Sequence, residues 1–143
     1  MARIASLILI SAAMAACGGS TTEPLASSTL IGDFGGDQVV LRATSSGAEI
    51  QFSCMEILVS KPLVTDGGGH FSATGGRRRT GGPVPIIPEN PTPVRLDGRA
   101  YLTQGGTIQL VIADIPEESG APTAWADTLT LVRDKMATIY LCP

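Results

Sequence analysis

Apolar and polar residues alternate along several short stretches of this chain, which is the pattern of β-strands that bury one face. The clearest stretch is residues 48–54 (AEIQFSC), where Ala48, Ile50, Phe52 and Cys54 fall on the face expected to be buried and polar residues fall on the other. Residues 38–43 (QVVLRA) precede it across a Thr-Ser-Ser-Gly turn. The two runs predict a β-hairpin.

The same signals recur to the end of the chain. Further strands or extended segments are expected at 55–59, 61–64, 70–74, 94–102, 107–114, 125–133 and 137–142. Gly98 in mid-strand predicts a bulge or a bend. Residues 75–93, rich in Gly, Pro and Arg, predict a long loop of the kind that is functional or mobile. About eight short strands at close spacing predict an all-β fold: a small antiparallel β-barrel, lipocalin-like, or a sandwich.

Residues 1–17 have a different character from the rest. A positive start at Arg3 precedes an apolar run, small residues and Cys17, in the order of a secretory signal. The run is too short to span a bilayer. Met14-Ala15-Ala16-Cys17 resembles the bacterial lipobox, which implies cleavage before Cys17 and attachment of acyl chains such as palmitate to it. An ordinary signal peptide cut near Ala16 is the alternative.

This interpretation divides the chain into three parts. Residues 1–16 are expected to be a signal peptide, 17–28 a lipidated flexible tether rich in Gly, Ser and Thr, and 29–143 the β-domain. The 143 residues are enough for one hydrophobic core but not two. A net charge of −3 argues against a nucleic-acid partner, which would favour a basic surface.

Three cysteines are present. If Cys17 carries lipid, Cys54 and Cys142 remain as an even pair in an oxidising compartment, where a disulfide is expected. The bond would close a loop of roughly 90 residues and stabilise the fold by roughly 4 kcal/mol. Two reduced or metal-binding thiols are the alternative, but no CxxC motif or nearby histidine supports a metal site.

Part of the pattern resembles a group of small bacterial secreted or lipid-anchored proteins with no assigned activity. The residues that carry this resemblance are Gly35-Gly36-Asp37, Leu41, Cys54, Pro62-Leu63, Asp66, Gly69, Phe71, Gly81-Gly82-Pro83, Gly98, Leu110, Leu129 and Cys142. It implies a compact β-domain with Cys54 and Cys142 paired and carries over no catalytic residue. Gly32-Asp33-Phe34 also resembles the N-terminal lipocalin motif, with Phe34 in place of Trp.

Candidate catalytic groups are few. His70 is the single histidine and could in principle join Ser72 or Ser53 and Asp66 in a triad, but no nucleophile-elbow motif surrounds these serines. A surface histidine beside a glycine-rich turn is the favoured interpretation. We therefore predict no catalytic residue.

The sequence also gives little evidence for a catalytic carboxylate pair or for a metal site. Asp97 with Asp114, or Glu117 with Glu118, could form the carboxylate pair of a glycosidase, but sequence cannot show the distance that this requires. Asp66 and the glycines after it lack the further oxygen ligands of a calcium loop. We expect solvated carboxylates, no metal and no cofactor.

The sharpest charge feature is Arg77-Arg78-Arg79, a candidate contact loop for anionic lipid, acidic glycan or an envelope protein. A solvated loop is the competing interpretation. The sequence thus predicts an extracytoplasmic protein that is anchored through Cys17 to a bacterial membrane, the outer membrane in a Gram-negative cell. We expect a non-catalytic binding or structural module; the alternatives are a lipocalin-like carrier of a small ligand and an enzyme with an unrecognised site.

Overall fold

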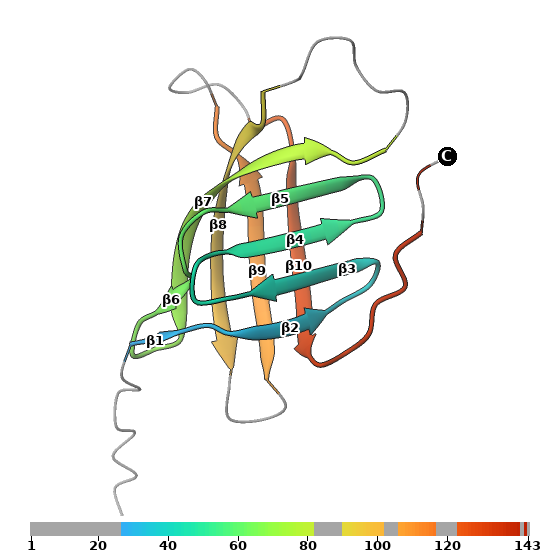
Figure 1. The fold of residues 1–143 in the computed structure, drawn as a ribbon. Coiled ribbons are helices and arrows are strands. Elements are labelled where there is room, and N and C mark those ends of the chain that lie inside the picture. The colour runs from blue at the N-terminus through green and yellow to red at the C-terminus, as the bar shows by residue number, and fades with distance from the viewer. Residues whose placement is uncertain (1–26, 82–89, 102–105, 117–122, 141, 143) are drawn as a thin grey trace, which may run out of the picture.

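The fold is an all-β closed barrel (Figure 1). The computed structural model describes residues 27–81, 90–101, 106–116, 123–140 and 142. The barrel strands are β2 (Gly32–Gly35), β3 (Val39–Ala43), β4 (Ala48–Phe52), β5 (Met55–Val59), β7 (His70–Arg79), β8 (Thr92–Tyr101), β9 (Thr107–Asp114) and β10 (Ala126–Arg133). A second, two-stranded sheet pairs β1 (Ser28–Thr29) with β6 (Val64–Thr65). Within these residues, no helix is long and apolar enough to cross a bilayer.

The barrel strands follow one another as an antiparallel meander, in the order β10-β2-β3-β4-β5-β7-β8-β9. In Figure 1, β2 to β5 run across the direction of β8, β9 and β10. The ten-residue β7 joins the two groups, because its C-terminal half pairs with β5 while residues 70–77 pair with β8. On the other side β10 meets β2 through two residue pairs, Val132 with Gly35 and Arg133 with Phe34. The barrel prediction is confirmed and the sandwich alternative is wrong.

Alternation along the strands fills the interior with apolar side chains. The buried cluster consists of Leu30, Phe34, Val39, Leu41, Ala43, Ala48, Ile50, Ile57, Val59, Leu63, Phe71, Val94, Leu96, Ala100, Ile108, Leu110, Ile112 and Leu131. Every strand of the barrel contributes to it. The inward face predicted for residues 107–114 is confirmed, since Ile108, Leu110 and Ile112 are fully buried. The inward face predicted for residues 48–54 is confirmed at Ala48 and Ile50, but Phe52 is only half-buried and Cys54 is exposed because it lies beyond the end of β4.

The predicted hairpin of residues 38–43 and 48–54 is confirmed as β3 and β4, and β9 has the predicted bounds. The expected last strand at 137–142 is wrong, because the described residues beyond β10 form no strand. Instead, β2 completes the set of eight barrel strands, and its pairing with β10 closes the barrel. The expected loop at 75–93 is also shorter than predicted, since β7 extends to Arg79 and β8 begins at Thr92.

Gly98 forms no bulge. Its strand pairs continuously with both neighbours, Phe71 on β7 and Leu110 on β9. The Phe71 ring instead lies over Gly98, where a Cβ atom would overlap it. Gly98 is therefore a packing feature: its missing side chain makes room for a buried aromatic ring inside the barrel.

Cys54 and Cys142 lie at disulfide-bonding distance, with their Cα atoms 5.3 Å apart, so the predicted pair is present. Cys54 lies between β4 and β5. The link therefore fixes the segment after β10 to the β4–β5 connection rather than a terminal strand to the hairpin. Because its ends are 88 residues apart, the bond closes a long loop in the unfolded chain, which contains five of the eight barrel strands (β5 and β7 to β10).

Candidate functional site

The three arginines of the predicted contact loop lie at the end of strand β7, not in a loop. Side chains alternate along a strand, so Arg77 points into the barrel with Phe71 while Arg78 points outward. A run of like charges in sequence is therefore divided between two environments. Their roles must be considered one at a time.

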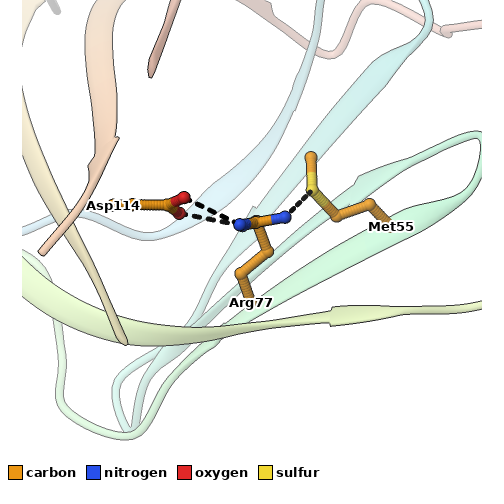
Figure 2. Close-up of polar contacts among 3 residues, drawn as sticks. All are labelled: Met55, Arg77 and Asp114. Carbon is orange, nitrogen blue, oxygen red and sulfur yellow. Dashed lines mark hydrogen bonds and ion pairs between the residues drawn. The ribbon is translucent and has the colours of Figure 1, made fainter. Parts of the chain in front are cut away.

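Arg77 makes a two-pronged ion pair with Asp114 inside one end of the barrel (Figure 2). Its Nε donates to Asp114 Oδ1 at 2.9 Å and its Nη2 to Oδ2 at 2.8 Å. Nη1 lies 3.9 Å from Met55 Sδ, at hydrogen-bond distance for sulfur. The guanidinium carbon is 5.2 Å from the centre of the Trp125 ring. The Asp114 side chain is 6% exposed and that of Arg77 25%.

This arrangement leaves little for a ligand to bind. The planar fork of arginine matches both carboxylate oxygens, and the indole ring covers a face of the guanidinium. Phe52 packs edge-on against Trp125, with ring centres 6.3 Å apart, and both rings pack against the buried apolar cluster. We interpret Arg77 and Asp114 as a structural pair that closes one end of the apolar interior.

The other two arginines differ from Arg77. Arg78 pairs with Glu56 on the outer surface of the neighbouring strand β5. Arg79 is exposed at the end of β7. Because two of the three guanidinium groups make ion pairs within the protein, the run does not present three free cations to a partner.

A different part of the surface is hollowed, though shallow and widely open to solvent. A hollow of about 830 Å³ lies over the outer face of β7, β8, β9 and β10, and we call it the β7–β10 hollow. Its lining is Asp66, His70, Phe71, Ser72, Asp97, Gly98, Arg99, Tyr101, Gln109, Leu110, Val111, Thr128, Leu129 and Thr130. Strand register arranges its outward side chains in rows. One row is His70, Arg99, Gln109 and Thr130, and the next is Ser72, Asp97, Val111 and Thr128.

One rim of this hollow is a tight turn between β6 and β7. Asp66 Oδ1 accepts hydrogen bonds from the backbone N–H groups of Gly68 at 2.8 Å and His70 at 2.9 Å. These two bonds, that from His70 above all, lower the pKa of Asp66 below its usual value. Gly69 adopts a left-handed conformation with φ of 79°, and its carbonyl accepts the Ala100 N–H of β8 at 2.9 Å. The rim is therefore an ionised carboxylate held on a braced turn.

The floor of the hollow carries an exposed arginine beside an exposed tyrosine. Arg99 Nε donates to the Gly68 carbonyl at 3.1 Å, and its guanidinium carbon is 5.1 Å from the centre of the Tyr101 ring. The Tyr101 hydroxyl lies 3.5 Å from Gln109 Oε1. Tyr101 is 40% exposed and Val111 is 47% exposed. The surface thus offers an aromatic ring and a methyl-rich side chain among hydrogen-bonding groups.

The residues considered for catalysis are not arranged as a catalytic triad. His70 and Ser72 both point outward from β7, and Asp66 bonds the backbone N–H of His70. Ser53, the other candidate nucleophile, lies near Cys54 in the β4–β5 connection, and its hydroxyl is buried without a hydrogen-bond partner among the described residues. These groups do not form the nucleophile–base–orienter chain that a triad needs.

The candidate carboxylate pair is also separated. Asp97 faces outward from β8, where Arg95 pairs with it at 2.8 Å, whereas Asp114 is buried inside the barrel. Glu117 and Glu118 lie outside the described residues. Across the part of the chain that the structure describes, no group of three His, Cys, Asp or Glu side chains is placed to hold a metal ion.

Four residues that line the hollow, Asp66, His70, Ser72 and Asp97, were considered from the sequence only for catalysis or metal binding, and Arg99, Tyr101 and Gln109 were missed. The alternation in 94–102 and 107–114 places Arg99, Tyr101 and Gln109 on outward faces, but only strand order shows that these faces are adjacent. The lipid-attachment residue predicted at Cys17, with the signal peptide, lies outside the described residues. No protein-family model matches this chain, and no curated protein or solved structure matches it either.

Proposed function

We propose that this protein is a non-catalytic binding module of the bacterial cell envelope, anchored through Cys17, which engages its ligand at the β7–β10 hollow. The observation that carries the proposal is the hollow itself, with the hydrogen-bonded turn at its rim and the neighbouring Arg99 and Tyr101 side chains. Side chains that are already held in place lose little conformational freedom when a ligand binds. These features favour a hollow that binds a ligand over a surface that is only solvated.

The packed interior argues against the carrier alternative. An eight-stranded barrel is just wide enough either to be filled by side chains or to hold one small ligand. Here the large inward residues of both strand groups, such as Ile50, Leu96 and Leu110, are fully buried in one cluster. A carried ligand would need the space that they occupy.

The position of the hollow fits a membrane-anchored protein. Asp66 on its rim directly follows β6, and β6 pairs with β1, the first strand of the domain. Ser27, where the described chain begins, is the tenth residue after Cys17, and ten residues reach at most about 35 Å. A lipidated Cys17 would therefore keep the hollow close to the membrane surface, where envelope components are concentrated.

The binding proposal is tested by site-specific photo-crosslinking in living cells. A photoreactive residue at Gln109, inside the hollow, should give a defined adduct. The matched position is Arg42, which is exposed in mid-strand on the outer face of β3. Equal adducts at both positions, or none at Gln109, would contradict a binding role for the hollow.

The anchor is tested separately. Cys17→Ala should move the protein from the membrane to the soluble extracytoplasmic fraction, because two or three acyl chains give stable attachment and their loss removes it. Membrane association that is unchanged in Cys17→Ala would rule out anchoring through this residue.

A further inference from the structure

The chemistry of the β7–β10 hollow specifies a ligand class. Its charged groups are Asp66, Asp97 and Arg99, with Arg95 paired to Asp97 at its edge. Both signs are present in nearly equal number, so the hollow has no strong field of either sign. A polyanion or a polycation would be repelled by the groups of its own sign, and the few groups of opposite sign would add little binding energy.

The uncharged groups are mainly hydroxyls and an amide. Ser72, Thr128 and Thr130 place hydroxyls along β7 and β10, and Gln109 places its amide between them on β9. Each hydroxyl can donate and accept, and the amide does both through adjacent atoms. The set matches a ligand that is itself rich in hydroxyl groups.

Two features of the floor add an apolar requirement. Tyr101 exposes its ring and Val111 its methyl groups between the polar side chains. Pyranose rings have hydroxyls at their edges and C–H groups on their faces, so they can stack on an aromatic ring while their edges hydrogen-bond. The guanidinium of Arg99 lies beside the Tyr101 ring and donates a hydrogen bond to the Gly68 carbonyl, so a polar group adjoins this aromatic ring.

The dimensions agree with a chain rather than a single small molecule. The two rows of side chains cross four strands, which at the usual strand spacing is roughly 14 Å. The hollow is open along its length on the outer face of the sheet, so a polymer can enter and leave without threading. Neighbouring sugar units could then meet the two rows in turn.

We infer that the β7–β10 hollow binds a neutral oligosaccharide chain, with Tyr101 as the stacking residue and Arg99, Gln109 and the Asp66 carboxylate as hydrogen-bonding groups. This inference rests on the proposed function and names the ligand of the same site.

The test is saturation-transfer difference NMR of the full mature chain in lipid nanodiscs. The probes are a panel of neutral oligosaccharides (gluco-, manno-, galacto- and N-acetylglucosamine tetramers) and an anionic tetragalacturonate. At least one neutral tetramer should bind and the anionic one should bind more weakly. Tyr101→Ala should weaken binding about five- to ten-fold, the loss expected for one aromatic contact. The matched control is Tyr140→Ala, since Tyr140 is 60% exposed beyond β10 and lies outside the hollow.

Three results would overturn the inference: no binding by any neutral tetramer, equal binding in Tyr101→Ala, or tighter binding of tetragalacturonate. Failure here is distinguishable from failure of the proposed function. If no neutral tetramer binds but the Gln109 position still crosslinks in cells, the hollow binds a ligand of another class. If the crosslink is absent as well, the hollow is not a binding site.

Discussion

The Arg77–Asp114 pair allows a quantitative prediction. Replacing Asp114 with Asn keeps the volume of the side chain but leaves the Arg77 guanidinium without its carboxylate. Loss of one partner of a buried pair typically costs about 3–5 kcal/mol. Because a quarter of the Arg77 side chain stays exposed, water can reach the freed guanidinium, so we expect a loss somewhat below this range, about 2–3 kcal/mol.

Urea unfolding measures this loss directly. Trp125, the single tryptophan, lies beside the pair and supplies the fluorescence signal, while far-UV circular dichroism follows the strands. With a denaturant slope of about 1.5–2 kcal/mol/M, the midpoint should fall by about 1–2 M. The disulfide is kept oxidised in every sample so that only the pair changes.

A double-mutant cycle separates the pair from other effects of substitution. Arg77→Met alone should also destabilise, and the double variant should lose less than the sum of the two single losses, by about 1.5–3 kcal/mol. The matched control is Asp97→Asn, whose partner Arg95 is 63% exposed, and a surface pair of that kind contributes about 0–1 kcal/mol. Additive single losses, or a change in Asp114→Asn no larger than in Asp97→Asn, would refute the reasoning.

The disulfide, Gly98 and Asp66 each allow a further test. Thiol labelling of the unfolded, unreduced chain should find no free thiol at Cys54 or Cys142, and reduction should lower the free energy of unfolding by roughly 4 kcal/mol; labelling of either residue contradicts the bond. Gly98→Ala should destabilise the barrel by about 1–3 kcal/mol, because its Cβ overlaps the Phe71 ring; unchanged thermal stability would show that the ring can move aside. Ionised Asp66 should stabilise its turn at pH values above 3.8, the usual pKa of the group, and this stabilisation should be lost as the pH falls through the lowered pKa of the folded state. NMR titration of the neighbouring backbone amides measures that pKa, and a midpoint at or above 3.8 would contradict the prediction.

The local pattern of apolar and polar residues predicted most strands, but not where several of them end. The run 107–114 places Ile108, Leu110 and Ile112 on one face, and it matches β9 residue for residue. Residues 75–79 begin with two glycines, which are depleted in strands, yet they form the second half of β7 because β5 pairs with residues 76–79 and β8 with residues 75–77. Residues 137–142 have the opposite character: β-prone in sequence, but without a strand partner among the described residues. Pairing with distant strands therefore decided both outcomes.

By itself, the sequence determined the all-β class, the inward faces of the best strands and the pairing of the two cysteines available to the domain. These follow from side-chain period and from composition, which are local or countable properties. Tertiary structure alone decided the rest. It separated Arg77 from Arg78, set Asp114 inside and Asp97 outside, and brought Arg99, Tyr101 and Gln109 together on one face. Such neighbours arise from strand order and register across the barrel, which depend on contacts between residues far apart in the chain.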